Sequence, residues 1–136
     1  NTGALTISGG SITGIVSAET VEGIKCDGLM TISGGTIDLQ ATGTGARGIK
    51  ADGGLVVSED TAPTSITIAA SGEQWVNPNN AKDSTRSGCI RVKGDMVVNA
   101  GTITLTYADG CNGIKVDKSE NLQINGGTIT ANGKVI

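Results

Sequence analysis

A six-residue motif that recurs along the chain constrains the fold more than any other feature of the sequence. It reads GIKCDG from Gly23, GIKADG from Gly48 and GIKVDK from Gly113, and a divergent copy, CIRVKG, begins at Cys89. These starts lie 25, 41 and 24 residues apart, so the repeat unit has about 25 residues and one unit carries about 16 more. The additional residues fall mostly in 72–86 and partly in 59–63. Tandem units of this length indicate a repeat architecture.

Apolar residues alternate with polar ones inside each unit and align into columns between units. Period-two alternation is typical of strands with one buried face. The letters SGG, NGG and NAG between the strands supply the positive φ angles of turns. The paired columns are Ile24, Ile49, Ile90 and Ile114 beside Cys26, Ala51, Val92 and Val116; Leu5, Met30, Leu55, Met96 and Leu122 beside Ile7, Ile32, Val57, Val98 and Ile124; and Ile12, Ile37, Ile66, Ile103 and Ile129 beside Gly14, Leu39, Ile68, Leu105 and Ala131.

Three short strands per unit predict an all-β fold, a right-handed, single-stranded parallel β-helix. It should have about five rungs, each about 4.8 Å above the one before. A leucine-rich repeat is excluded, because no stretch has the helical period of about 3.6 residues. We expect a single β-helix domain over residues 1–136, with residues 72–86 as an inserted loop of the middle rung.

Composition and charge exclude several functions. The chain has no His, which removes the commonest general base and zinc ligand. A net charge of −3 argues against a nucleic-acid partner or an anionic membrane surface. No run of about 18 apolar residues exists that would insert into a membrane, and the first residues do not form an export signal. Three cysteines are too few for a disulfide scaffold.

Outward side chains of the motif also stack, and they are charged. One column consists of Lys25, Lys50, Arg91 and Lys115, and the next consists of Asp27, Asp52, Lys93 and Asp117. Like charges about 4.8 Å apart repel by about 0.9 kcal/mol even in water. Either the two columns neutralise each other, or they bind a polymer of matching charge such as a uronic-acid polysaccharide. Such binding would be direct, through Lys and Arg, or through calcium held by the aspartates.

Residues 72–86 contain Trp75, the only Trp of the chain. Long loops on rigid scaffolds often carry function, so Trp75 is a candidate sugar-stacking platform. The alternative is that it covers a thin rung. Oxygen ligands are present at Asn77, Asn79, Asn80 and Asp83, but their spacing does not match an EF-hand loop.

Hydroxyl side chains form a second outward array. Its pairs are Ser11 and Thr13, Thr36 and Asp38, Ser65 and Thr67, Thr102 and Thr104, and Thr128 and Thr130. Strand propensity is a sufficient explanation. The alternative is an ice-binding face, since T-x-T arrays resemble those of insect-type antifreeze proteins, although Asp38 interrupts the array.

The cysteines are expected to stay reduced. Cys26 occupies an inward column and is expected to be an inert core thiol. Cys89 and Cys111 should lie about 8 Å apart at Cα, beyond ordinary disulfide reach unless the corner between their rungs is tight.

Long stretches of the chain resemble a bacterial family of secreted carbohydrate-binding proteins. They are GIKCDGLMTISGGTIDLQATGTGARGIKADGGL, MVVNAGTITLTYADGCNGIKVD and LQINGGTITANG, which together cover nearly everything except residues 72–86. Members of that family repeat G-I-(K/H)-A-D-G followed by L-T-I-S-G-G-T-I-T. The resemblance implies a β-helix similar in shape to pectate lyases, calcium sites, and binding of plant polysaccharides such as pectin or cellulose without established catalysis. It assigns the acidic position of the motif to Asp27, Asp52 and Asp117 and the basic position to Lys25, Lys50 and Lys115.

We therefore predict a polysaccharide-binding module, secreted or at the bacterial cell surface, for acidic plant or microbial glycans. The expected ligand-binding residues are Lys25, Lys50, Arg91, Lys93, Lys115 and Trp75. The candidate cofactor is calcium, with Asp27, Asp52 and Asp117 as metal ligands. One alternative is a structural or adhesin-like segment that contacts protein. Another is a polysaccharide lyase, with Arg91 or Lys93 beside Asp52 or Asp117.

Both ends of the sequence stop inside a rung, where a β-helix would expose apolar core and unpaired backbone. We expect the chain to be a piece of a longer exported protein or to stack end to end with another copy.

Overall fold

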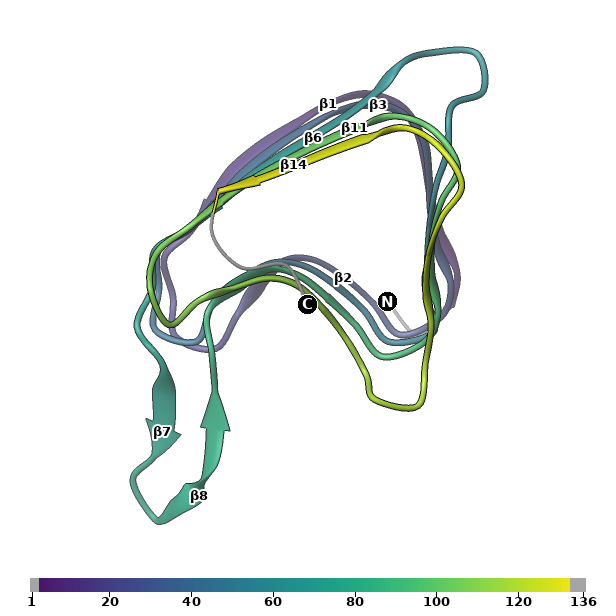
Figure 1. The fold of residues 1–136 in the computed structure, drawn as a ribbon. Helices are drawn as coiled ribbons and strands as arrows, with labels where there is room; N and C mark the ends of the chain where they lie inside the picture. Colours follow the sequence, from purple (N-terminus) through teal and green to yellow (C-terminus); the bar gives the residue numbers. More distant parts are fainter. Residues whose placement is uncertain (1–2, 133–136) are drawn as a thin grey trace.

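The computed structural model describes residues 3–132, which form fourteen β-strands and no helix. The fold is an all-β parallel β-solenoid of about five turns, seen along its axis in Figure 1. Residues 3–132 therefore offer no helix that is long and apolar enough to cross a membrane. The strands are β1 (Leu5–Val16), β2 (Glu22–Cys26), β3 (Met30–Ala41), β4 (Arg47–Ala51), β5 (Leu55–Val57), β6 (Thr64–Ala70), β7 (Trp75–Asn77), β8 (Asn80–Thr85), β9 (Gly88–Val92), β10 (Met96–Val98), β11 (Thr102–Tyr107), β12 (Asn112–Val116), β13 (Leu122–Ile124) and β14 (Thr128–Asn132).

Three walls of stacked parallel strands enclose the core (Figure 1). One wall is the sheet of β2, β4, β9 and β12. The other two are continuous with each other: β5, β10 and β13 stack on the first half of β1 and β3, and β6, β11 and β14 stack on the second half. The long strands β1 and β3 turn this corner at Gly10 and Gly35, whose φ angles are 82° and 95°. Glycine adopts such angles without the steric penalty of a Cβ.

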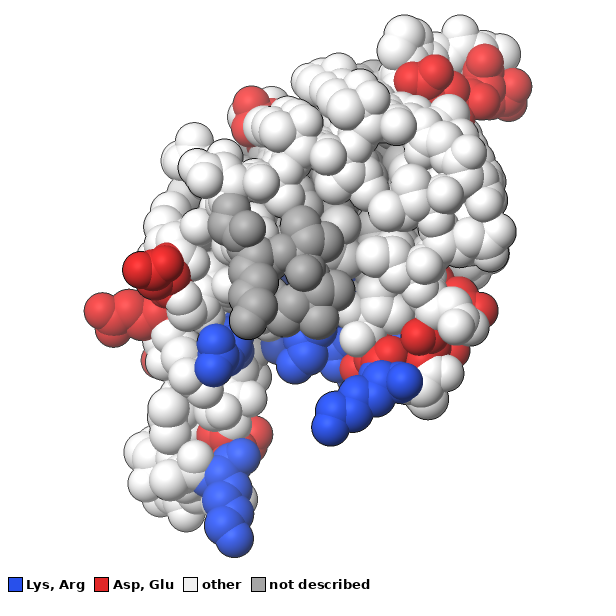
Figure 2. All heavy atoms as spheres, viewed as in Figure 1, with Lys and Arg blue, Asp and Glu red and all other residues white. Residues whose placement is uncertain are grey.

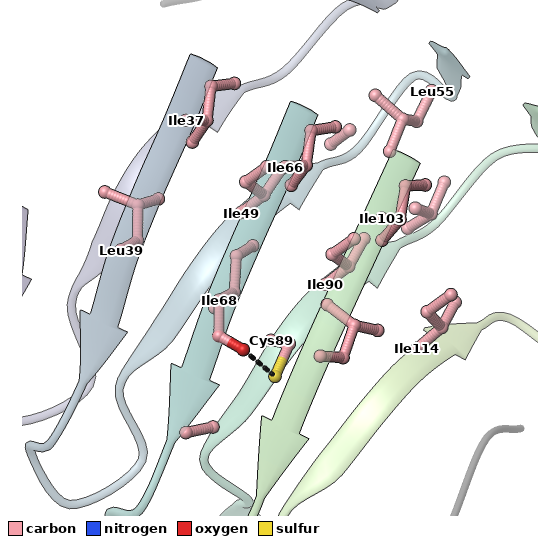
Figure 3. Close-up of a cluster of buried hydrophobic side chains, with 14 of the residues drawn as sticks. Ile37, Leu39, Ile49, Leu55, Ile66, Ile68, Cys89, Ile90, Ile103 and Ile114 are labelled. Atoms are coloured by element: carbon pink, nitrogen blue, oxygen red, sulfur yellow. Dashed lines mark hydrogen bonds between the residues drawn. The ribbon is translucent and has the colours of Figure 1, made fainter. Parts of the chain in front are cut away.

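The register between rungs is the one that the apolar columns predict. Ile12, Ile37, Ile66, Ile103 and Ile129 pair in that order along one wall. Ile37, Ile66 and Ile103 are fully buried and form a ladder through the core, drawn in Figure 3, and Ile129 packs against it. Ile12, in the first rung, is 36% exposed. Full burial of one such side chain stabilises the fold by about 1.5–3 kcal/mol, so these ladders hold the rungs together.

The wall of β2, β4, β9 and β12 bows toward the interior (Figure 1). The glycine of the motif lies close to the opposite side of the core. A Cβ built on Gly48 would lie 2.7 Å from Ile68 Cγ2, on the opposite wall, and 2.8 Å from the carbonyl oxygen of Cys89. Gly48 and its neighbour Ile49 are both buried, so the alternation of the strand breaks between them. At Gly113 a Cβ would lie 2.7 Å from Cε1 of Tyr107. The motif therefore carries Gly where the bowed sheet approaches the far side of the core.

Cys89 stands where the other copies of the motif have this glycine. Its thiol points toward the backbone carbonyl of Ile68 at 3.6 Å, drawn as a dashed line in Figure 3, and that of Thr106 at 3.7 Å. Burial raises the pKa of Cys89 to about 12, so the thiol stays protonated and unreactive. All three cysteines are buried and free in the structure. Cys26 belongs to the core, as its inward column predicts.

Residues 72–86, expected as a loop, form a β-hairpin instead. Strands β7 and β8 pair antiparallel, with Trp75 opposite Thr85 and Val76 opposite Ser84. The hairpin projects from the corner of the solenoid that precedes the bowed sheet (Figure 1). Two contacts fix its base, because Gly45 N donates to the carbonyl oxygen of Glu73 at 2.8 Å and Arg86 Nη1 donates to that of Gly110 at 3.4 Å.

We predict that Gly48→Ala destabilises the protein by about 2 kcal/mol, because the new methyl group overpacks the contact with Ile68. Gly9→Ala is the matched control, since a Cβ at Gly9 would meet no atom within 4 Å. Urea unfolding followed by circular dichroism measures both. A loss at Gly48 no larger than that at Gly9 would contradict the close approach of the two walls.

Candidate functional site

The outer surface of the bowed sheet brings the predicted charged residues together. Lys25, Lys50, Arg91 and Lys115 pair in register across β2, β4, β9 and β12. The second column, Asp27, Asp52, Lys93 and Asp117, follows directly after these strands. Its members are also stacked, because the backbone N–H groups of Asp52, Lys93 and Asp117 each donate to a carbonyl of the preceding rung. Both columns therefore exist as the sequence predicts, and we refer to them together as the charged ladder.

Ion pairs link the two columns, both within rungs and between them. Within rungs, Nζ of Lys25 lies 3.1 Å from Oδ1 of Asp27, and Nζ of Lys50 lies 3.7 Å from Oδ2 of Asp52. Between rungs, Lys93 lies 3.9 Å from Asp52. Arg91 Nη2 donates a hydrogen bond to Oδ1 of Asp117. Much of the charged ladder is thus neutralised by its own members.

Two residues that the sequence analysis did not single out belong to the same network. Glu22 lies 3.5 Å from Nη1 of Arg47 and 3.8 Å from Nζ of Lys50. Strict alternation would place Arg47 on the same face as Ile49, inside the core. Because Gly48 and Ile49 are both buried, the alternation breaks there, and Arg47 is half-buried beside Glu22 instead. This break is the only signal in the sequence that would have revealed Arg47.

Burial and pairing oppose each other in the electrostatics of the charged ladder. The side chains of Lys50 and Arg91 are only 15% exposed, because the concave wall shields them from water. Burial lowers the pKa of Arg47, and the nearby carboxylate of Glu22 counteracts this. At the more exposed end, the hydrogen bond with Asp27 raises the pKa of Lys25, and the same bond lowers the pKa of Asp27. Both shifts favour the charged forms of Lys25 and Asp27.

The last rung differs from the others, because its lysines keep free charge. Lys115 and Lys118 are exposed and make no ion pair with any residue in 3–132. Together with Arg91, Val116, Asp117 and Ser119 they line a pocket of about 400 Å³. Three cations and one carboxylate surround this pocket, and Arg91 already holds that carboxylate. Figure 2 shows Lys and Arg gathered along the hollow beside the projecting hairpin.

Comparison with known proteins agrees with this geometry. A family model described as carbohydrate-binding domain-containing protein matches residues 1–134. The chain belongs to this family. No curated protein and no solved structure matches the chain significantly.

The family thus makes carbohydrate the ligand class, and the resemblance to calcium-containing members raises the question of a metal site. Among residues 3–132, no three Cys, Asp or Glu side chains gather where they would hold one ion. Asp27, Asp52 and Asp117 each face a Lys or Arg side chain. Since Ca²⁺ takes six to eight oxygen ligands, these three aspartates do not fit a shared calcium site.

Trp75 lies at the base of the hairpin. It is half-buried, and its Cβ lies 2.8 Å from the position that a Cβ on Gly45 would occupy. This close approach joins the hairpin to the turn that leads into β4. Its role as a sugar platform stays a prediction.

The hydroxyl array lies on the outer surface of β1, β3, β6, β11 and β14. Its files are in register, as Ser11, Thr36, Ser65, Thr102 and Thr128 pair in that order. Asp38 pairs with Thr13 and Thr67 and interrupts the second file. Ice binding at this surface stays a prediction.

We predict that Glu22→Gln lowers the free energy of unfolding by about 1–2 kcal/mol, because Arg47 and Lys50 lose a shared carboxylate in a shielded position. Glu19→Gln is the control, since Glu19 is exposed and forms no ion pair within residues 3–132; it should change stability by less than about 0.5 kcal/mol. Urea unfolding at pH 7 compares the two, and equal effects would argue against a stabilising role for Glu22.

Proposed function

We propose that this chain binds acidic polysaccharides along its bowed, charged sheet, and that the pocket of the last rung takes an acid group of the glycan. The observation that carries the proposal is that Lys115 and Lys118, which form no ion pair with any residue in 3–132, line a pocket together with Arg91. The protein as a whole has a net charge of −3, so a local excess of positive charge differs from the rest of the surface. Such an excess favours an anionic partner.

The free charge of Lys115 has a traceable cause. In the regular copies of the motif, a Lys pairs with the Asp two residues later, as Lys25 does with Asp27. The copy at Cys89 has Lys93 in place of that Asp, so Arg91 pairs instead with Asp117 of the next rung. Lys115 is thereby left without the carboxylate that its own rung supplies.

The shape of the site supports a polymeric ligand. The charged ladder runs along the solenoid axis, with rungs about 4.8 Å apart, and the bowed wall gives it a concave floor. The pocket of about 400 Å³ lies at one end of this floor. That volume falls in the range of about 300–1,000 Å³ that is usual for small-ligand sites, so one sugar unit can enter the pocket while its neighbours lie over the floor.

We further propose that the domain binds glycans without cleaving them and that it works outside the cell or at its surface. The family description names binding rather than catalysis. Arg91 and Lys93, the candidate bases of a lyase, are both engaged in ion pairs, with Asp117 and Asp52 respectively. The proposed site requires a long polymer that carries acid groups. Extracellular polysaccharide is such a polymer, which supports a secreted or surface location.

We predict that the double variant Lys115→Gln, Lys118→Gln weakens binding to polygalacturonate about tenfold, as expected for the loss of two charge contacts of about 0.7 kcal/mol each. Lys82→Gln, on the exposed hairpin strand β8, removes one charge elsewhere and should leave affinity within about twofold. Affinity electrophoresis and isothermal titration calorimetry at low salt measure the difference. Failure of the unaltered protein to bind any acidic glycan would refute the proposal.

We also predict that Lys93→Asp weakens binding about threefold or more, although it lies outside the pocket of the last rung. The new carboxylate restores a partner for Arg91 within its own rung, which releases Asp117 to neutralise Lys115. Lys93→Gln is the control for loss of the charge alone. The same calorimetric titration compares them, and equal effects of Asp and Gln would contradict the exchange of partners.

A further inference from the structure

We propose that this chain recognises the acid groups of its glycan by direct ion pairing, without a bridging calcium ion, and that calcium weakens the complex. The inference rests on the proposed function and concerns how the same site works. It departs from what the resemblance implies, since related sequences are associated with calcium sites. The reason lies in how the aspartates of this chain are partnered.

The spacing of Asp52 and Asp117 does not suit a shared ion. Asp27 and Asp52 lie on neighbouring rungs, whereas Lys93 occupies the next position of the column and separates Asp52 from Asp117. The backbone positions of Asp52 and Asp117 are therefore two rungs, about 10 Å, apart. Calcium binds its ligand oxygens at about 2.3–2.6 Å, so residues that share one ion must converge more closely than this.

The Lys and Arg side chains that pair with the aspartates also disfavour binding of a calcium ion. Asp52 lies between Lys50 at 3.7 Å and Lys93 at 3.9 Å, and Asp117 accepts the hydrogen bond from Arg91. A calcium ion at either carboxylate would lie beside these positive groups and would have to displace them. Lysine or arginine thus already lies beside both carboxylates, although Oδ1 of Asp52 accepts no hydrogen bond within residues 3–132.

The hairpin offers no better oxygen site. Asn77 Oδ1 accepts a hydrogen bond from the backbone of Asn79 at 2.9 Å, and Asn80 Oδ1 accepts one from the backbone of Lys82 at 3.2 Å. Asp83 Oδ2 accepts a third from Asn77 Nδ2 at 3.0 Å. These oxygens stabilise the hairpin turn and are oriented by it, rather than converging on one point.

Direct pairing and calcium bridging predict opposite responses to calcium. If Lys115 and Lys118 contact the glycan carboxylates themselves, calcium competes with them by binding the same carboxylates. If calcium bridges protein and glycan, its removal abolishes binding. The sign of the calcium effect therefore separates the two modes.

The test is calorimetric titration of the intact chain with short polygalacturonate oligomers that stay dissolved in the presence of calcium. Binding is measured in EDTA, in millimolar calcium chloride, and in sodium chloride of matched ionic strength. We expect binding in EDTA and an affinity about three- to fivefold weaker in calcium than in matched sodium chloride, the size of an exposed ion-pair effect. Binding that requires calcium, or is tightened by it, overturns the inference but leaves the proposed function standing. No binding in any buffer refutes the proposed function itself.

A variant gives a second, independent sign. Asp52→Asn releases Lys50 and Lys93 from their carboxylate, so under direct pairing it strengthens binding by about two- to threefold. Under calcium bridging it weakens binding instead. Asp27→Asn, at a more exposed position, serves the same purpose if the first variant does not fold. Titration of calcium into the protein alone should show no saturable heat, and a saturable site for calcium would contradict the inference without any glycan present.

Discussion

In-register stacking of the rungs is the constraint on which the rest of this structure depends. Each strand hydrogen-bonds to the corresponding strands of the neighbouring rungs. A residue type that recurs in the motif therefore forms a column along the axis, with successive members about 4.8 Å apart. For inward residues this gives the isoleucine ladders of the core. For outward residues it places like charges next to one another, which is unfavourable unless each has a counter-charge. The ion pairs of Lys25 with Asp27 and of Lys50 with Asp52 supply this counter-charge within each rung.

The bend of the charged wall follows from a second constraint, the narrowness of the core. The wall approaches the opposite side so closely at Gly48 that a methyl group would collide with Ile68. This approach makes the outer surface concave and leaves side chains such as Arg91 largely shielded from water. A shielded charge interacts more strongly with a partner than a fully exposed one. The glycine of the motif therefore shapes the candidate site although it touches no ligand.

Period-two alternation was sufficient to predict the fold, the register and the two charged columns. In a parallel stack, equivalent residues of successive rungs align, so the pattern of one rung predicts the columns of all rungs. It was not sufficient for Arg47, since the alternation breaks at Gly48, and Glu22 was missed with it. The hairpin of residues 72–86 was also missed, because β7 (WVN) and β8 (NAKDST) are short and do not share the period-two pattern of the repeat. The free charge at Lys115 could not be predicted from any single rung. It depends on whether Asp117 pairs with Lys115 in its own rung or, as observed, with Arg91 in the preceding rung.

That dependence shows how one departure from a repeat can create a site. A perfectly regular ladder would pair every lysine with the aspartate of its own rung and would present a neutral surface. Replacement of one aspartate by Lys93 shifts the pairing from within rungs to between them, toward Asp52 on one side and Asp117 on the other. The displaced positive charge then appears at Lys115, one rung away from the substitution. A charge substitution in one rung changes the ion pairs of the adjacent rungs, because the charged columns are stacked. In a solenoid, binding sites are therefore to be sought next to the irregular rung as well as on it.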